Sequence, residues 1–265
     1  FWLMQICMSQ NARWSDLGPR IVSAAVLGIV ALAAVLLGGP IFLTFVCVFC
    51  GLMVWEVARM FDAKLPIGLG ILAGIVCGAA AIVPQIYIIP LLLGLGIVVT
   101  GQTGTDRPLL FAGTVWICFG ALAFLFLRQD AGLLWFAWLV LVVIVSDVAG
   151  YFAGRFLGGP KFWPRISPKK TWSGTVAGWF AAALIGAIFS VWLGNTATLV
   201  LLSVIAAFAG QMGDIAQSAV KRRRGIKDSS NLIPGHGGVF DRFDAMLGAG
   251  AFVLLVKKIG LVSIL

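Results

Sequence analysis

Long apolar runs separated by short polar segments dominate this chain. Runs of about 18 or more apolar residues recur, and each is long enough as a helix to cross roughly 30 Å of hydrocarbon. Hydrophobic residues make up 61% of the 265 residues and charged residues only 11%, whereas a soluble domain carries about 25% charged residues. The pattern therefore predicts an all-α fold, a polytopic transmembrane helical bundle.

The apolar runs, with the Gly and Pro residues that separate them, predict about nine spans. The first run follows Arg13 and Arg20, as a signal peptide would, but it is long and no convincing cleavage site follows, so we interpret it as a retained helix. The predicted spans are 21–37, 41–58, 66–83, 86–100, 108–127, 132–153, 174–193, 197–216 and 245–263. We divide the chain into residues 1–130, with about five spans, and residues 131–265, which contain two polar loops, 154–173 and 217–244.

The distribution of Lys and Arg predicts the orientation. With a cytoplasmic N-terminus, sixteen of the nineteen basic residues fall in cytoplasmic segments, and only Arg128 lies on the opposite face. This bias is the positive-inside signal, and it predicts a multi-pass protein of the cell (inner) membrane whose two polar loops face the cytoplasm. Lys257 and Lys258 fall near the end of the ninth span, where we expect their long side chains to snorkel.

The net charge of +9 does not indicate nucleic-acid binding, because the basic residues lie between apolar spans. There they face anionic lipid headgroups or an anionic substrate. Cys47 and Cys50 form a C-x-x-C pair, but no second Cys pair or nearby His completes a metal site in the sequence. We interpret these cysteines as small apolar residues of a membrane helix.

Two acids lie at the ends of predicted spans. Asp147 is near the end of the sixth span and Asp214 at the end of the eighth. A carboxylate at membrane depth costs roughly 2.5–3.5 kcal/mol on insertion scales and usually faces an interior site. Such an acid can also snorkel from a helix end, so neither residue alone defines a site.

The loop 217–244 combines acids, bases and glycines. Asp214, Ser218, Lys221 and Arg222 share one face if the eighth span continues as a helix. Pro234 and three glycines then predict a tight loop, and its backbone N–H groups are suited to bind phosphate. Asp241 and Asp244 follow on one side of a new helical turn.

This combination is typical of phosphoryl or nucleotidyl transfer. A triphosphate requires Mg²⁺, which hard carboxylate oxygens bind, and Lys and Arg to neutralise its oxygens. Headgroup binding by a basic cytoplasmic loop would explain the cations alone, but not the interleaved acids. The loop 154–173 follows Tyr151 and adds Arg155 and further cations, so two cationic loops are expected to meet on one face.

The segment from Ser218 to Asp244 resembles the signature of the CDP-diacylglycerol synthase (phosphatidate cytidylyltransferase) family. The matching positions are Ser218, Lys221, Arg222, Lys227, Asp228, Pro234, His236, Gly237, Gly238, Asp241, Arg242 and Asp244. Further elements of the family pattern are matched by Ser146, Asp147, Tyr151, Gly154, Arg155, Ser167, Pro168, Lys169, Lys170 and Thr171. Ser173 departs from the acidic or amide residue that many members have after Thr-Trp, which weakens an acid role at that position.

The resemblance implies that CMP passes from CTP to phosphatidic acid, giving CDP-diacylglycerol and pyrophosphate, with residues 131–265 as the catalytic region. It also implies Mg²⁺ and a second, monovalent cation such as K⁺. The implied metal ligands are Asp214 and Asp241, and the other implied catalytic residues are Asp244, Lys221, Arg222 and Asp147. Implied substrate contacts come from Ser167, Lys169, Lys170, Thr171, Ser218, Lys227, Asp228, His236, Gly237, Gly238, Arg242, Tyr151 and Arg155.

Several alternatives stay open from sequence. A CTP-dependent lipid kinase of the polyprenol type would release CDP, a secondary transporter would move its substrate without nucleotide turnover, and an inactive homologue would only bind lipid. His236, the sole histidine, is interpreted as a loop or phosphate contact rather than a general base, because a phosphate monoester is already largely ionised near pH 7. A homodimer is also left open.

Overall fold

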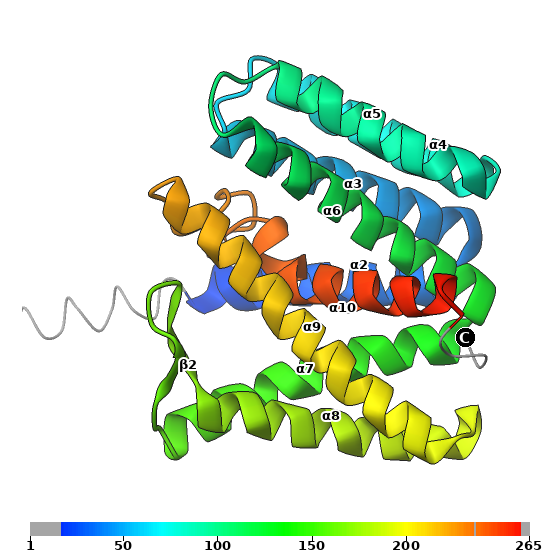
Figure 1. Cartoon of the computed structure of the whole chain (residues 1–265), viewed down its shortest axis with the longest axis vertical. Helices are drawn as coiled ribbons and strands as arrows, with labels where there is room; N and C mark the ends of the chain where they lie inside the picture. Colours follow the sequence, from blue (N-terminus) through cyan, green and yellow to red (C-terminus); the bar gives the residue numbers. More distant parts are fainter. Residues whose placement is uncertain (1–16, 236, 261–265) are drawn as a thin grey trace, which may run out of the picture.

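The computed structural model describes residues 17–235 and 237–260 of the chain, with side chains described from residue 21 onward. Nine long helices occupy this part of the chain, one at each predicted span (Figure 1). Their bounds are α2 Leu17–Leu37, α3 Gly39–Met60, α4 Pro66–Ile82, α5 Ile88–Gly101, α6 Arg107–Phe126, α7 Leu133–Phe156, α8 Trp172–Leu193, α9 Thr196–Arg223 and α10 Phe240–Lys258. A 3₁₀ turn, η1 (Gln85–Tyr87), precedes α5, and a π-helical turn, η2 (Leu127–Ala131), follows α6.

Proline and glycine set several of the helix ends. Helices α3, α4 and α6 each carry a proline in their first two positions, where the missing N–H costs no helical hydrogen bond. Gly132 precedes α7 at a φ of 96°, a conformation that glycine adopts without steric cost. These are the breaks that the sequence predicts between spans.

Five of the helical segments are long and apolar enough to cross a membrane. They are Gly39–Met60, Arg107–Ala131, Leu133–Phe156, Trp172–Leu193 and Thr196–Arg223. Three further apolar segments, Ile21–Leu37, Pro66–Ile82 and Gln85–Gly101, are shorter. The chain is therefore a membrane-embedded helical protein.

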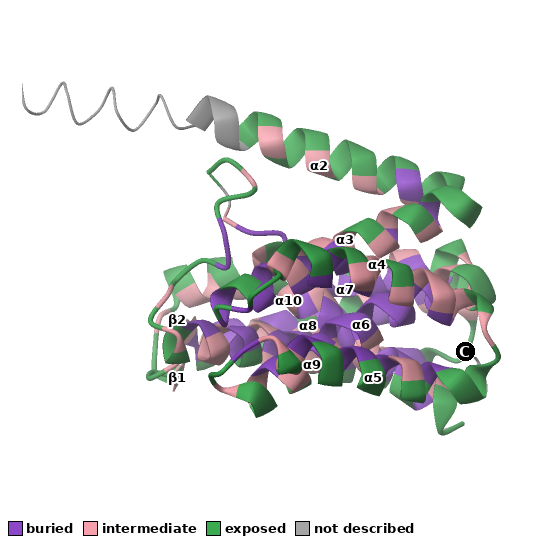
Figure 2. Ribbon diagram, turned by 90° about the horizontal axis from the view of Figure 1, so that it is seen from above, coloured by how far each residue is buried: buried purple, intermediate pink, exposed green. Residues whose placement is uncertain are grey.

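The helices pack closely through small residues. A Cβ on Gly51 would lie 2.7 Å from the carbonyl oxygen of Gly70, so α3 and α4 touch through their backbones. A Cβ on Gly150 would lie 3.1 Å from the carbonyl oxygen of Gly174, so α7 and α8 are in close contact at this glycine. Figure 2 shows the buried residues along the centre of the bundle, whereas α2 is largely exposed and contacts the other helices mainly at its C-terminal end, where Ala34 is buried.

The predicted loop 154–173 contains a small β-hairpin. Strand β1 (Lys161–Trp163) pairs antiparallel with β2 (Ser167–Thr171), and α8 begins directly after β2. The sequence predicts a polar loop here but not the hairpin, because a strand of three residues is too short to show an alternating pattern. Thr171 caps α8 by accepting a hydrogen bond from Gly174 N–H at 3.2 Å.

The predicted loop 217–244 is shorter than expected. Helix α9 continues to Arg223, as the shared face of Asp214, Ser218 and Lys221 requires, and α10 begins at Phe240. Only residues 224–239 are therefore outside these helices. Asp241 and Asp244 lie in the first two turns of α10, as predicted.

Polar contacts distinguish the two ends of the bundle. At one end the hairpin, the end of α9 and the loops that follow α3 and α5 lie together (Figure 1). At the other end Lys257 Nζ lies 3.6 Å from Asp130 Oδ2, and Lys258 Nζ donates to Gln85 Oε1 at 2.5 Å. The two lysines thus reach polar groups beyond the apolar part of α10, in agreement with the expected snorkelling.

The four cysteines of the described residues are free thiols inside the bundle. Cys50 and Cys118 are fully buried, with 3.7 Å between their Sγ atoms. Among the described residues, no three His, Cys, Asp or Glu side chains are arranged to hold a metal ion. Cys50, Cys77 and Cys118 are buried among the helices, and Cys47 is half-buried.

Candidate active site

A polar cavity of about 460 Å³ opens at the end of the bundle that carries the hairpin. Helices α7, α8, α9 and α10 and strand β2 form its walls. It is lined by Ser146, Asp147, Gly150, Tyr151, Gly154, Arg155, Lys169, Lys170, Thr171, Gly174, Thr175, Gln211, Asp214, Asp241, Asp244 and Ala245. Nine of the predicted site residues are among them, from segments separated by up to 97 positions in the chain, Asp147 to Asp244.

A larger groove of about 580 Å³ lies between α3 and α4. Its lining is almost entirely apolar, with Cys47 as the one residue in the lining that has a titratable side chain. Such a surface suits lipid chains but offers nothing to a phosphate. We therefore place the chemistry in the smaller, polar cavity.

Lysines pair with both carboxylates that are expected to bind a metal. Lys170 Nζ lies 2.5 Å from Asp214 Oδ2, and Lys221 Nζ lies 2.7 Å from Asp241 Oδ1. The carboxyl group of Asp244 is within hydrogen-bonding reach of Asp214. The cavity thus gathers acids and cations in alternation, as the sequence predicts.

Asp241 is the most completely hydrogen-bonded of these acids. Its Oδ1 accepts from Lys221 and from Gln217 Nε2 at 3.1 Å. Its Oδ2 accepts from the N–H of Ser229 at 2.8 Å, the N–H of Gly238 at 3.0 Å and the hydroxyl of Ser229 at 3.0 Å. Hydrogen bonds of this kind favour the ionised form of a carboxyl group, so the surroundings hold Asp241 as a carboxylate.

This arrangement changes the expected role of the glycine loop. The N–H of Gly238 donates to Asp241 rather than pointing into the cavity. Gly237 adopts a φ of 82°, and its carbonyl oxygen accepts from Ile233 N–H at 2.9 Å. In the structure the N–H of Gly238 is therefore directed at a carboxylate in the first turn of α10.

Residues of α7 and the hairpin complete the cavity wall. Tyr151 and Arg155 lie one turn apart on α7, and Arg155 donates to the Tyr151 hydroxyl at 2.9 Å. Ser173 contacts Thr171 Oγ1 at 3.0 Å and donates to the carbonyl oxygen of Gly158. Ser173 thus ties the hairpin to the end of α7, which gives this departure from the family pattern a structural role.

Other predicted site residues lie outside the cavity lining. Ser218 donates to Asp214 Oδ1 at 3.4 Å, so it supports that carboxylate from α9. Arg222 is exposed and donates to the carbonyl oxygen of Ile226 at 3.5 Å. Three more exposed residues, Lys227, Asp228 and Arg242, and the half-buried Ser167 are also absent from the lining, and His236 lies outside the described residues.

Glu56 is a residue that the sequence analysis missed. It is fully buried in α3, and it contacts both the 224–239 segment and the start of α10. Like Asp147, Glu56 is a carboxylate within an apolar run, the predicted span 41–58, where its burial is costly. Its partners lie 173 to 184 positions later in the chain, so the sequence gives no sign of what it binds.

The donors in this region suit a hard cation. They are all oxygens, mainly carboxylates, which is the chemistry that Mg²⁺ prefers. In the described part of the chain, Gln217 Oε1 is a buried side-chain oxygen without a hydrogen-bond partner, and it lies beside Asp241 because Gln217 Nε2 donates to that residue. Mg²⁺ is commonly bound by one or two carboxylates together with substrate phosphates, so the donor set fits this ion although no three-residue cluster is preformed among the described residues.

The protein is a membrane-embedded helical bundle whose cavity contains acids paired with lysines. These features are those of an enzyme that acts on phosphate-bearing substrates at a membrane. The comparisons with known proteins give the family. The model of the cytidylyltransferase family matches residues 18–259, and this chain belongs to that family. It is accordingly a CTP-utilising nucleotidyltransferase.

Relatives from several bacteria agree with this assignment. The chain is 36% identical to the phosphatidate cytidylyltransferase of Brucella suis biovar 1, over 92% of this chain and 94% of that protein. It is 32% identical to the phosphatidate cytidylyltransferase of Rickettsia bellii, over 68% of this chain and 85% of that protein. Similarity over nearly the whole length favours this family over the transporter that the sequence analysis left open.

Proposed function

We propose that this protein is a phosphatidate cytidylyltransferase, which transfers CMP from CTP to phosphatidic acid and releases pyrophosphate. The observation that carries the proposal is the cavity in which Asp214 and Asp241 are each paired with a lysine. It lies at the end of the bundle that gathers most of the basic loops, where a soluble nucleotide and a lipid headgroup can meet. In the reaction a phosphate oxygen of the lipid attacks the α-phosphorus of CTP, and the bond to pyrophosphate breaks.

The residues of the cavity divide into phosphate-binding and acidic groups. Lys169, Lys170 and Arg155 line it and neutralise phosphate oxygens. Lys221 does not line the cavity itself but is held against Asp241, which does, and its charge stabilises the leaving group. Phosphoryl-type transfer needs little from the protein beyond such positioning and charge stabilisation.

Mg²⁺ would be held by Asp214 with Asp241 or Asp244, and it would neutralise charge on the triphosphate when bound. Asp244 lies close to Asp214, which favours it as the second ligand. Asp241 already accepts from five donors, which would compete with the metal ion. A monovalent cation beside Asp241 would find an oxygen donor in Gln217 Oε1. These assignments are tested by the concentration of Mg²⁺ that half-saturates Asp241→Asn and Asp244→Asn.

We also propose nine membrane spans, with the N-terminus and the cavity on the cytoplasmic side of the inner membrane. The excess of basic residues at the cavity end supports this orientation. Helix α10 has 19 residues and is about 28 Å long at 1.5 Å per residue, close to the thickness of the hydrocarbon core. Lys257 pairs with Asp130 and Lys258 donates to Gln85. These contacts of the end of α10 with loops at the far end of the bundle support the proposal.

The direct test uses purified protein in detergent with phosphatidic acid, Mg²⁺ and CTP labelled at the α-phosphate. We expect Mg²⁺-dependent transfer of the label into the lipid phase, and loss of that transfer in Asp241→Ala. A lipid kinase would leave the α-label in water-soluble CDP. Absence of turnover by folded protein would contradict the proposed function.

A further inference from the structure

Glu56 connects the first half of the chain to the segment that carries the site. Its side chain is 0% exposed. Oε1 accepts from the hydroxyl of Ser230 at 2.6 Å and from Val239 N–H at 2.8 Å. Oε2 accepts from Phe240 N–H at 2.7 Å and from the hydroxyl of Ser229 at 3.0 Å. Four donors therefore satisfy the four lone pairs of one buried carboxylate.

Two of these donors are backbone N–H groups at the N-terminus of α10. Those groups have no partner within the helix, and a negative charge is favourable at this end of a helix dipole. The side chain of Val239, the residue before α10, makes no capping hydrogen bond. Glu56 thus caps α10 from another helix.

The third donor links Glu56 to Asp241. The hydroxyl of Ser229 lies 3.0 Å from Glu56 Oε2 and 3.0 Å from Asp241 Oδ2, and the N–H of Ser229 also donates to Oδ2. The same network requires glycine at position 238, because a Cβ there would collide with Glu56 Oε1 and Ser229 Oγ. Glu56, Ser229 and Asp241 form one contiguous network.

We infer that Glu56 is a positioning residue, which fixes the carboxylate of Asp241 through Ser229 and through the start of α10. The inference rests on the proposed function in that Asp241 serves the transfer of CMP. It also gives residues 1–130 a role in the reaction, although none of the residues described in this range lines the cavity. Groups that orient a metal-binding carboxylate contribute about 10–100-fold in metal affinity or activity.

The test compares Glu56→Gln, Glu56→Asp and a matched control, Thr114→Val, in purified protein. Thr114 is also fully buried, but its hydroxyl donates only within its own helix, to Leu110 at 2.9 Å. Glu56→Gln keeps the size of the side chain but turns two acceptor sites into donors. We expect kcat to fall at least about tenfold, with a higher Mg²⁺ requirement and an unchanged KM for phosphatidic acid, and Glu56→Asp to recover part of the loss.

A double-mutant cycle separates positioning from general stability. If Glu56 acts through Ser229, Glu56→Gln combined with Ser229→Ala will lose clearly less activity than the sum of the two single losses predicts. Additive losses, or an unchanged kcat and Mg²⁺ requirement in folded Glu56→Gln, would overturn the inference. So would equal losses in Thr114→Val.

Hydrogen exchange gives a readout that does not depend on turnover. We expect residues 229–240 to exchange faster in Glu56→Gln than in the wild type, and at the wild-type rate in Thr114→Val. If the wild type transfers no CMP, the proposed function fails. Faster exchange of this segment in Glu56→Gln would still establish that Glu56 anchors the segment. Unchanged exchange of residues 229–240 in Glu56→Gln would overturn the anchoring role of Glu56, whatever the activity.

Discussion

At the scale of single residues, Lys221 is the cation on which the site depends most directly. Its side chain is 11% exposed, and it is paired with an Asp241 side chain that is 5% exposed. Lys221→Met should lower kcat by roughly 10²–10³, as the loss of one preorganised charge does in other active sites. The exposed Lys64 provides the matched control, and Lys64→Met should retain wild-type turnover.

The measurement is the rate of α-labelled CTP incorporation into lipid, with thermal unfolding in detergent to establish that each variant is folded. Lys221 is the better target than Arg222, its neighbour in the signature, because Arg222 is exposed and bonded to its own loop. A folded Lys221→Met variant with nearly full turnover would contradict the role assigned to this lysine.

Gly238 is the residue whose lack of a side chain matters most to the signature segment. A Cβ would meet both Glu56 and Ser229, and overpacking of a tight interior costs about 1–3 kcal/mol. Gly238→Ala should lower both the midpoint of thermal unfolding and the CMP transfer rate. Gly104→Ala is the control in another loop at the same end, since a Cβ on Gly104 would have no atom within 4 Å. Equal unfolding midpoints for Gly238→Ala and Gly104→Ala would contradict this prediction, because the backbone around residue 238 would then be able to accommodate the extra methyl group.

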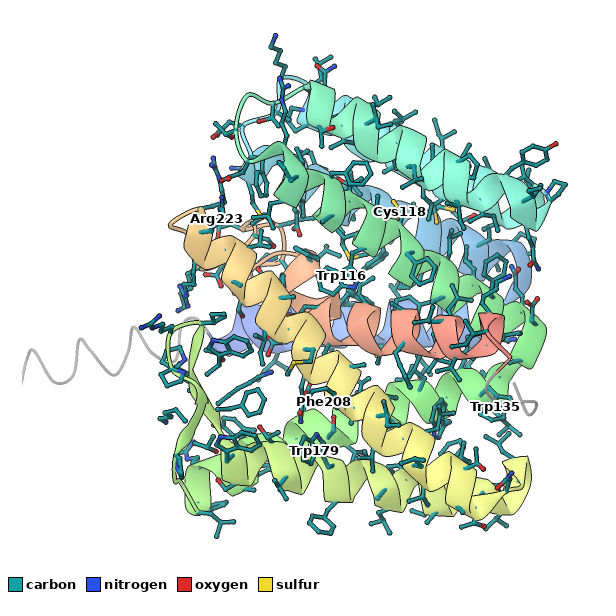
Figure 3. The ribbon with its side chains drawn as sticks, in the orientation of Figure 1. Trp116, Cys118, Trp135, Trp179, Phe208 and Arg223 are labelled. Carbon is teal, nitrogen blue, oxygen red and sulfur yellow. The ribbon has the colours of Figure 1, made fainter. Side chains whose placement is uncertain are left out.

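At the scale of elements, the end of α9 is held by the loops of the first half of the chain. Arg224 donates to the carbonyl oxygen of Met60 at 2.9 Å and to Asp62 at 2.7 Å, and it lies over the ring of Phe61. Arg223, one position earlier and labelled in Figure 3, pairs with Asp106 at 2.6 Å, but its side chain is 64% exposed. The hydrogen bond from Arg223 lowers the pKa of Asp106 from its ordinary value, yet solvent screens such a pair.

The two neighbouring arginines therefore make an internal comparison. Arg224→Ala should destabilise the protein by on the order of 1.5–3 kcal/mol, the range for hydrogen bonds to charged groups. Arg223→Ala should leave the unfolding midpoint nearly unchanged, and any difference should vanish at high salt. The two midpoints, measured in the same detergent, check this. A larger loss for Arg223→Ala would mean that α9 is anchored elsewhere.

The elements also show why part of the structure was predictable. Helix positions follow from long apolar runs and their Pro and Gly breaks, so each of the nine predicted spans overlaps a helix of the described chain. The sequence predicts the last span at 245–263, whereas α10 is Phe240–Lys258, and residues 261–263 lie outside the described residues. The polar cavity followed from acids and bases placed at helix ends. The hairpin and the Glu56 network did not follow, because three-residue strands carry no period, and Glu56 meets Val239 only through folding across 183 positions. Sequence patterns report local structure, and these contacts are set by packing.

At the scale of the whole molecule, the proposed topology places the two ends of α10 on opposite sides of the membrane. Lys227 precedes α10 at the cavity end, and Lys258 is its last residue, beside Gln85. Lys227→Cys and Lys258→Cys, in a chain in which Cys7 and Cys47 are replaced by Ser, test this. The remaining thiols of Cys50, Cys77 and Cys118 are fully buried and give little background.

A membrane-impermeant maleimide should label Lys258→Cys from the periplasmic side and Lys227→Cys only in inverted vesicles. The result follows from the charge distribution, because sixteen basic residues would otherwise face the wrong side of the membrane. Labelling of both positions from one side would mean that α10 does not cross the membrane. The reverse pattern, with Lys227→Cys labelled from the periplasmic side, would turn the cavity away from the cytoplasm, and cytoplasmic CTP could then not reach it. This single pair of variants therefore decides between the topologies on which access of CTP to the cavity depends.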